Sequence, residues 1–265
     1  SEQQKVMASS AALSVPKQPA DRIGRFPGYV AIVRRELAQD YTSEQLTADG
    51  LSVYTAFDPQ IHRGLDQGRK NALTRLKATG LDSQGEVQLG AIMVDIPTGE
   101  IQAVLAGRDQ RLGFHRVLDA RRQIGSLVKP FVVAAAIEQD PRLHAGTLVR
   151  DETISIEDER GNVWTPKNYD EKELGIVRLE SVIAGSINQA TVHLAFGLGL
   201  DQILDRLDDL GIPVGPTRPP ATLLGVSELS PYQVAQRYQF LLNQGHQAPL
   251  KAVRTVVDDA GSVLM

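Results

Sequence analysis

A serine and a lysine spaced three apart head an otherwise apolar segment, GSLVKPFVVAAAIEQ, at residues 125–139. A serine hydroxyl is a weak nucleophile until a neighbouring base takes its proton. Residues i and i+3 share one face of a helix, so Ser126 and Lys129 are expected to lie one turn apart. Partial burial lowers the pKa of a lysine and lets its amine act as a base. The spacing therefore predicts acyl-transfer chemistry, with Ser126 as nucleophile and Lys129 as base.

The same two residues also have a purely structural interpretation. Ser126 can cap the helix that follows it, and Lys129 can lie on the surface. The pattern S-x-x-K is expected about once by chance in a chain of this length. Ser14 and Lys17 match it as well, in a Pro-containing stretch that is typical of a linker. The motif alone leaves both interpretations open.

A second polar pair favours the chemical interpretation of the first. Ser186 and Asn188 form the only S-x-N in the sequence and stand between two apolar helical patterns. A hydroxyl there can relay a proton to a leaving amine, and an amide can hold a lysine or a substrate amide. The alternative is a helix cap at a tight turn, a position that Ser and Asn favour.

The elements that must position these residues follow from hydrophobic periodicity, capping residues and turn signals. In the apolar helix after Pro130, we expect Val132, Val133 and Ile137 to face the core. The other predicted helices are residues 29–41, 58–76 (with Asp58 as cap), 177–185, 189–199, 200–211 and 230–245 (with Ser230 as cap and Gly245 as stop). The predicted strands are 51–57, the pair 87–96 and 101–107 around a turn, a strand-and-loop region at 148–170, and a hairpin at 251–265.

The bulk properties narrow the class of protein. The chain has 265 residues, 42% of them hydrophobic, and a formal net charge of −4, so it can bury a full core and shows no sign of a nucleic-acid partner. It has no cysteine, which excludes disulfides and thiolate catalysis. No apolar run is long enough to span a bilayer. The five histidines lack metal-ligand spacing, and nothing predicts a metal or other cofactor.

Together, the segments IGSLVKP and GSIN resemble two of the three active-site motifs of the penicillin-recognising serine transferases, the group of penicillin-binding proteins and serine β-lactamases. The flanking segments VDIPTGEIQAVLAG, HRVLDARRQIGSLVKP, VWTPKNYD, SINQATVHLA and ELSPYQVAQRYQFLLNQG resemble class A, bifunctional penicillin-binding proteins. The resemblance covers nearly all of residues 27–265. It implies an α+β transpeptidase fold, in which an antiparallel sheet accompanies an all-helical subdomain that carries both motifs.

The resemblance also implies a division of the chain. Residues 1–45 would be a linker behind a glycosyltransferase that this sequence lacks. Residues 46–84 would be a strand-helix lead-in, and residues 85–265 the N-terminal portion of the transpeptidase domain. The family's third motif, K-T-G or K-S-G, does not occur in the sequence. We therefore expect a fragment that ends inside the domain and that, alone, is acylated slowly or not at all.

By this resemblance the chain is a D,D-transpeptidase that cross-links peptidoglycan stem peptides. Ser126 would form the acyl-enzyme and would be the target of β-lactams. Lys129 would be the base, Ser186 would pass a proton to the leaving amine, and Asn188 would orient Lys129 and the substrate. We expect Gly125 and Trp164 to border the substrate.

The parent family implies a place in the cell and further partners. The protein would act on the periplasmic side of the bacterial inner membrane, held by an anchor that this sequence lacks. Its expected partners are a C-terminal fragment carrying K-T-G, an outer-membrane lipoprotein activator, and proteins of cell division or elongation.

Three other functions remain as alternatives to the transpeptidase. The first is a module that senses β-lactams and becomes acylated without turnover. The second is a catalytically silent fragment that docks partner proteins. A β-lactamase is disfavoured, because no E-x-x-L-N supplies a hydrolytic glutamate between the motifs.

Overall fold

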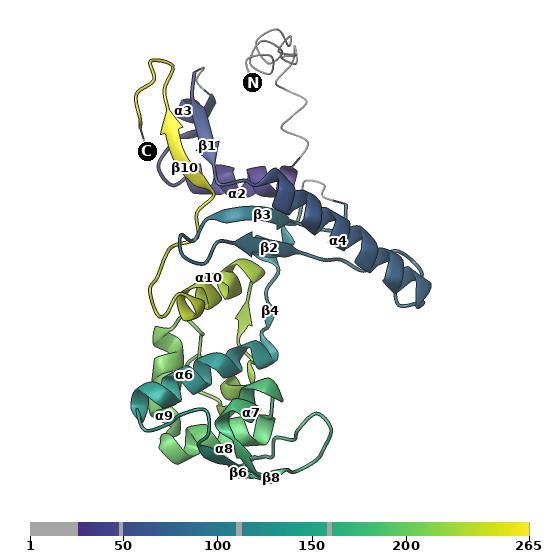
Figure 1. Ribbon diagram of the computed structural model, residues 1–265, viewed down its shortest axis with the longest axis vertical. Helices are drawn as coiled ribbons and strands as arrows, with labels where there is room; N and C mark the ends of the chain where they lie inside the picture. The colour runs from purple at the N-terminus through teal and green to yellow at the C-terminus, as the bar shows by residue number, and fades with distance from the viewer. Residues whose placement is uncertain (1–25, 48–49, 110–112, 158–160, 265) are drawn as a thin grey trace, which may run out of the picture.

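The computed structural model describes residues 26–47, 50–109, 113–157 and 161–264. The Ser14 and Lys17 motif and most of the predicted linker lie outside these residues. Within them the chain divides visibly into two parts (Figure 1). One has a core formed mainly by helices and is called the helix-rich part; the other combines helices with the longest strands and is called the strand-rich part. In the described part of the chain, no helix is long and apolar enough to cross a membrane.

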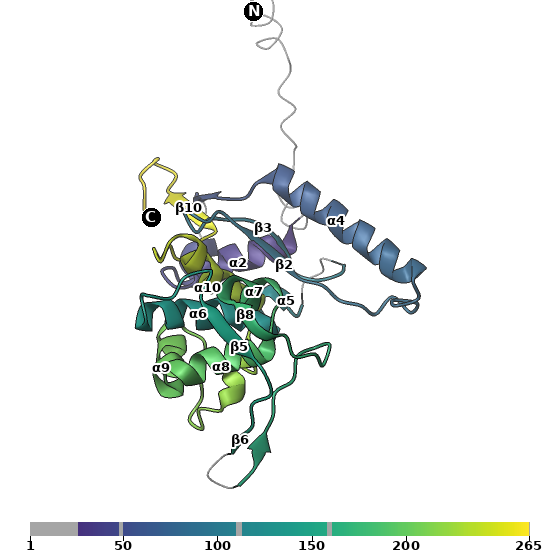
Figure 2. The same cartoon turned by 60° about the horizontal axis from the view of Figure 1, so that its bottom comes forward.

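The helix-rich part contains α6 (Lys129–Gln139), α7 (Leu179–Ala184), α8 (Asn188–Leu198), α9 (Leu200–Asp209) and the 3₁₀ turns η2 (Gly125–Val128) and η3 (Pro220–Leu224). The same part carries two hairpin-like pairs, β5 (Leu148–Asp151) with β8 (Gly175–Arg178), and β6 (Ile156–Glu157) with β7 (Val163–Trp164). The second pair projects from the body when the molecule is turned (Figure 2).

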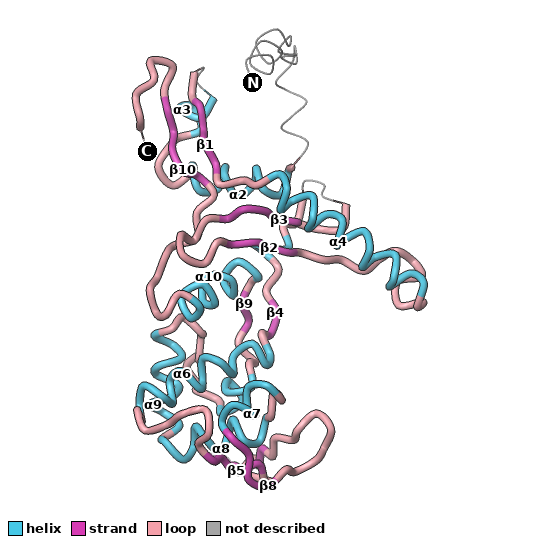
Figure 3. The backbone as a smooth tube through the Cα atoms, viewed as in Figure 1, coloured by secondary structure: helices cyan, strands magenta, loops and turns pink. Residues whose placement is uncertain are grey.

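The strand-rich part contains α2 (Pro27–Leu37), α3 (Ser43–Thr47), α4 (Pro59–Ala78), α5 (Arg116–Asp119) and α10 (Pro231–Leu242). Its strands are β1 (Ser52–Thr55) with β10 (Val253–Val257), and β2 (Ala91–Val94) with β3 (Ile101–Leu105). The short antiparallel pair β4 (Arg122–Gln123) and β9 (Glu228–Leu229) runs between the two parts (Figure 3).

Two antiparallel hairpins that the sequence predicted are present, and a further strand pair is not among the predictions. In the β2–β3 hairpin Ala91 lies opposite Leu105, as the turn between residues 96 and 101 predicted. The β1–β10 pair was not predicted: Ser52 lies opposite Val257, so strands about 200 residues apart in the sequence form one sheet. The chain then turns back, and Val263 bridges Val257, which confirms the C-terminal hairpin.

Two helices begin where their capping residues predicted. The Asp58 carboxylate accepts from the backbone N–H groups of Gln60 and Ile61, and α4 starts at Pro59. Ser230 and Gln233 form a complete capping box at the start of α10. These caps satisfy backbone donors that a helix end otherwise leaves unpaired.

The main hydrophobic core surrounds α6, which packs against α8 and α9. Val132 and Val133 are buried, as predicted. Ile137 is 40% exposed, so its predicted place in the core is wrong. The buried stripe of α6 continues through Ala135 and Ala136, which leaves position 137 on the outward face.

The predicted linker boundary at residue 45 does not coincide with a change in packing. The helix α2 contacts β3 and β10, and its Tyr29 hydroxyl donates a hydrogen bond of 2.7 Å to the carbonyl of Ile101. Tyr29 and Ile32 belong to the same buried cluster as Val104. Residues 27–37 are therefore part of the folded unit.

Candidate active site

Ser126 lies in the 3₁₀ turn η2, directly before α6, and its side chain is exposed. In a 3₁₀ turn residues i and i+3 are eclipsed, so Ser126 stands over Lys129, the first residue of α6. Neither η2 nor α6 has a side-chain cap, which excludes the interpretation of Ser126 as a helix cap. No hydrogen bond holds the Ser126 hydroxyl within the described residues, so it is free to meet a ligand.

Two glycines fix the turn that presents Ser126. Gly125 has φ +53° and Gly225 has φ +81°, a region that L side chains rarely adopt. The N–H of Gly125 donates to the carbonyl of Gly225 over 2.9 Å, which extends the β4–β9 pairing into η2. A Cβ on Gly225 would lie 2.0 Å from the carbonyl oxygen of Gly125, so this close approach requires glycine.

Lys129 is 1% exposed, so the predicted alternative of a surface lysine is wrong. Its Nζ donates to the backbone carbonyl of Ser186, to the Ser186 hydroxyl at 3.0 Å, and to Oδ1 of Asn188 at 2.6 Å. These three acceptors match the three protons of an ammonium group. Burial lowers the pKa of Lys129 to about 8. The amine is therefore held in place yet readily deprotonated, which suits a base.

Ser186 occupies the tight turn between α7 and α8, with a φ of +52° that is uncommon for a residue with a side chain. Its carbonyl and hydroxyl both contact the Lys129 amine. Neither Ser186 nor Asn188 caps α8 with its side chain. The capping interpretation of this pair is thus not supported. The positive φ of Ser186 instead accompanies a turn in which its carbonyl and hydroxyl both accept from the Lys129 amine.

The cap of α8 comes from a residue that the sequence had not singled out. Oδ1 of Asn168 accepts from the backbone N–H groups of Asn188 at 2.9 Å and Gln189 at 3.1 Å. Asn168 is buried, and its amide group donates to Oδ1 of Asp151. Asn168 lies within WTPKNYD, which was noted only for its family resemblance and its tryptophan. No local pattern distinguishes this asparagine from an ordinary loop asparagine, because its partners are distant in sequence.

Trp164 lies apart from the hydrogen-bonded group of Lys129, Ser186 and Asn188. It is half-buried on β7, where it packs against the main hydrophobic core and pairs with Ile156. Its predicted contact with a substrate stays a prediction, as does that of Gly125. The contact that the structure does give Gly125 is its backbone pairing with Gly225.

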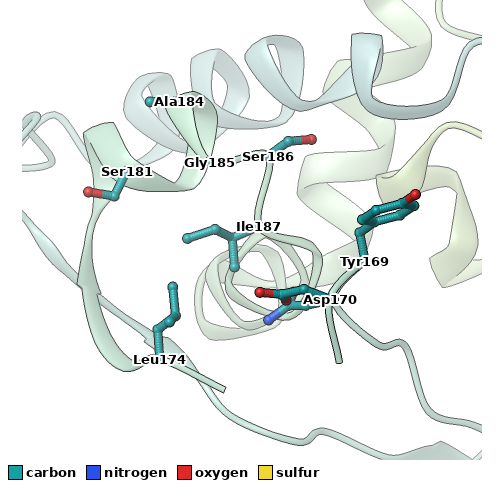
Figure 4. A pocket seen from close by; sticks show the side chains of 9 residues that line it. Tyr169, Asp170, Leu174, Ser181, Ala184, Gly185, Ser186 and Ile187 are labelled. Atoms are coloured by element: carbon teal, nitrogen blue, oxygen red, sulfur yellow. The ribbon is translucent and has the colours of Figure 1, made fainter. Parts of the chain in front are cut away.

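A cavity of about 600 Å³ borders the site at Ser186. It is lined by Asn168, Tyr169, Asp170, Leu174, Ser181, Ala184, Gly185, Ser186 and Ile187. Ile187 and Leu174 point into it, whereas the Ser186 hydroxyl points away from its centre (Figure 4). Ser186 thus separates this cavity from the Lys129 amine.

Comparison with known proteins gives one matching family model, the "Penicillin binding protein transpeptidase domain", over residues 89–263. Penicillin-binding protein 1B of Vibrio cholerae is 39% identical over 251 residues, which are 94% of this chain and 32% of that protein. Penicillin-binding protein 1B of Escherichia coli is 32% identical over 242 residues, which are 90% of this chain and 28% of that protein. The chain thus spans about a third of the length of these relatives.

A solved structure shares the fold. The PonA1 protein from Mycobacterium tuberculosis, in complex with penicillin V, superposes with a TM-score of 0.71 over 91% of this chain and 65% of that chain, at 23% identity. The expected α+β penicillin-binding fold is thereby confirmed.

Proposed function

Because this chain belongs to the family of penicillin-binding protein transpeptidase domains, we propose that it carries the acyl-transfer site of a D,D-transpeptidase that cross-links peptidoglycan stem peptides. The observation that best supports this proposal is the buried Lys129 amine, held by Ser186 and Asn188 beside the exposed Ser126. The acceptors of this buried amine all come from Ser186 and Asn188, the two polar residues of the second motif.

In the first half of the reaction the Ser126 hydroxyl attacks the carbonyl carbon between the two D-alanines. The neutral Lys129 amine accepts the hydroxyl proton as the new C–O bond forms. The proton passes through the Ser186 hydroxyl, 3.0 Å from Lys129 Nζ, to the nitrogen of the departing D-alanine. The C–N bond breaks, and the donor peptide remains as an ester on Ser126.

The second half reverses the order of these steps. An amine of a neighbouring stem peptide attacks the ester carbonyl and gives up a proton through Ser186 and Lys129. The C–O bond to Ser126 breaks, and its oxygen recovers a proton. A new peptide bond joins the two stem peptides, and the side chains of Ser126, Ser186 and Lys129 return to their starting states.

A β-lactam reacts by the same first step, the attack of the Ser126 hydroxyl on its carbonyl carbon. Opening of the lactam ring leaves its amine tethered to the acyl group, so the ester on Ser126 persists. The relative of known structure that holds penicillin V is consistent with such a ligand. Gly125 and Trp164 are proposed to border the bound peptide.

The proposed setting is the periplasmic side of the bacterial inner membrane. The proposed partners are a polypeptide that carries K-T-G, a lipoprotein activator of the outer membrane, and proteins of cell division or elongation. The identified relatives, penicillin-binding proteins 1B, support this setting through the family that they share with the chain.

The decisive experiment maps the site at which a penicillin binds covalently. The 265-residue chain and its Ser126→Ala variant are incubated with a fluorescent penicillin for minutes to hours, alone and with a K-T-G-bearing polypeptide. Intact-mass spectra and digests then locate the adduct. We expect one adduct per chain on Ser126, formed faster in the presence of the added polypeptide and absent from the variant.

Other outcomes contradict the proposal in distinguishable ways. A label that persists in Ser126→Ala would exclude this serine as nucleophile. Rapid release of hydrolysed penicillin would indicate a β-lactamase. A chain that stays unlabelled in both arms would favour a protein-docking role without catalysis.

A further inference from the structure

We infer that Asn168 is the positioning residue of the site: it sets the amide of Asn188, and through it the amine of Lys129. The inference rests on the proposed function, because it assigns Asn168 a role in acylation of Ser126. Asn168 itself touches neither the nucleophile nor the base. It acts through hydrogen bonds that connect two segments far apart in the sequence.

The first step concerns the orientation of the Asn188 amide. A protonated lysine amine only donates hydrogen bonds, so in this state Asn188 turns its oxygen toward Lys129, as the 2.6 Å contact shows. Its NH₂ group then needs an acceptor on the opposite side. That acceptor is the backbone carbonyl of Lys167, at 2.8 Å from Nδ2. The position of this carbonyl therefore determines which end of the amide faces the base.

The second step concerns what fixes the Lys167 carbonyl. Its peptide bond leads directly into Asn168, whose Oδ1 accepts from the backbone N–H groups of Asn188 and Gln189. One side chain thus ties the loop to the first turn of α8. The same helix end carries the amide that contacts Lys129. The loop and the base-holding residue consequently move as one unit.

The third step concerns what holds Asn168. Its Nδ2 lies 2.8 Å from Oδ1 of Asp151, 2.8 Å from the carbonyl of Lys172 and 2.9 Å from Oε1 of Gln189. The second Asp151 oxygen accepts from the N–H of Leu174 at 2.9 Å. Asp151 is 0% exposed, Gln189 3% and Asn168 8%. A buried network of this kind is rigid only while all its members are paired.

The test uses two substitutions that exchange donor and acceptor. Asn168→Asp keeps an oxygen for the α8 N–H groups but cannot donate to Asp151, and it sets two buried carboxylates side by side. Asn168→Asp combined with Asp151→Asn restores one donor between the two positions. Glu171→Gln is the matched control, since it neutralises an exposed side chain of the same loop that has no part in this network.

The readout separates chemistry from binding. Time courses of penicillin labelling at several concentrations give the acylation rate constant k2 and the dissociation constant of the non-covalent complex. We expect Asn168→Asp to lower k2 by about 10-fold to 100-fold, the effect of unpairing one or two buried polar groups. The dissociation constant should stay within about twofold of the parent value, because Asn168 is buried and its polar atoms are paired with other residues of the protein. The double variant should recover most of k2, and Glu171→Gln should match the parent.

The result distinguishes this inference from the function on which it rests. An unchanged k2 in Asn168→Asp, with labelling lost in Ser126→Ala, overturns the positioning role and leaves the proposed function standing. The same holds if the double variant is no faster than Asn168→Asp. Labelling that persists in Ser126→Ala overturns both. A lower melting temperature with an unchanged k2 in the folded fraction shows a purely structural residue and also contradicts the inference.

Discussion

Each of the two parts of the molecule buries a basic side chain, but the two side chains differ in their hydrogen-bond partners. In the helix-rich part Lys129 is 1% exposed and has three acceptors within reach of its amine. In the strand-rich part His62 is 4% exposed and lies against the rings of Phe26 and Phe57, at 4.7 and 5.3 Å between centroids. Its Nδ1 has no hydrogen-bond partner in the described part of the chain. Burial lowers the pKa of both groups.

The difference shows that a lowered pKa does not by itself make a base. Lys129 has a partner for each proton and an exposed hydroxyl, that of Ser126, one turn away, so its neutral form has a substrate to act on. The environment of His62 is aromatic and offers its Nδ1 neither a donor nor an acceptor. Desolvation perturbs pKa values in cores as well as in active sites. Under the proposed function, substitution of Lys129 should slow acylation of Ser126, whereas substitution of His62 should change the stability and leave acylation at the parent rate.

Lys129→Met should have the largest effect on the rate of acylation. Methionine keeps the apolar length of the side chain and removes the base, so acylation of Ser126 should fall by about 10²-fold to 10⁴-fold. The rate of the penicillin adduct, followed by intact mass, measures the effect. Far-ultraviolet circular dichroism controls for folding. A folded Lys129→Met chain that is labelled at the parent rate would contradict the assignment of Lys129 as base.

Asn188→Asp tests whether the lysine's partners set its working pH. In the parent, labelling should rise with pH and level off above the pKa of Lys129, about 8, because only the neutral amine accepts a proton. A carboxylate in place of an oxygen 2.6 Å from Nζ favours the charged amine and raises that pKa. Below it, labelling should slow by about tenfold for each unit of pKa gained.

The matched control for this pH profile is Asn188→Ala. It removes the same acceptor without adding charge, so it must not move the profile to higher pH. A profile that shifts equally in Asn188→Asp and Asn188→Ala would show that packing, and not charge, governs the amine.

The sequence predicted local features of the fold well and long-range ones less well. The caps at Asp58 and Ser230 and the β2–β3 hairpin depend on neighbouring residues, and the structure confirms them. The exposure of Ile137 was missed because it depends on where α8 and α9 cross α6. Hydrophobicity indicates that a helix is buried but not which of its faces meets solvent.

The same limit applies to the candidate site. The two motifs predicted one site for Ser126, Lys129, Ser186 and Asn188. The structure brings the last three of these into hydrogen-bonding distance. Asn168 was missed, since its value comes from contacts with Asp151 and Gln189, 17 and 21 positions away. Motif spacing identified the residues that are proposed to meet the substrate. The residues that position them become visible only when distant segments pack together.

His62→Phe should have the smallest effect, a change in the free energy of unfolding. Phenylalanine keeps a ring between Phe26 and Phe57 and removes the unpaired nitrogen, so the free energy of unfolding should rise by about 1 kcal/mol at neutral pH. Because the pKa of His62 is lowered in the folded state, the unfolded chain binds more protons below its ordinary value near 6.5. The parent should therefore lose stability as the pH falls through that value, and the gap to His62→Phe should widen until the folded pKa is reached.

Thermal melts between neutral and mildly acid pH measure this gap, and penicillin labelling at neutral pH should stay at the parent rate. The exposed His246, changed in the same way, provides the control and should keep the acid sensitivity of the parent. If His62→Phe slowed labelling as Lys129→Met does, the two buried bases would be functionally alike. The distinction between a buried base with partners and one without would then fail as a guide to the active site.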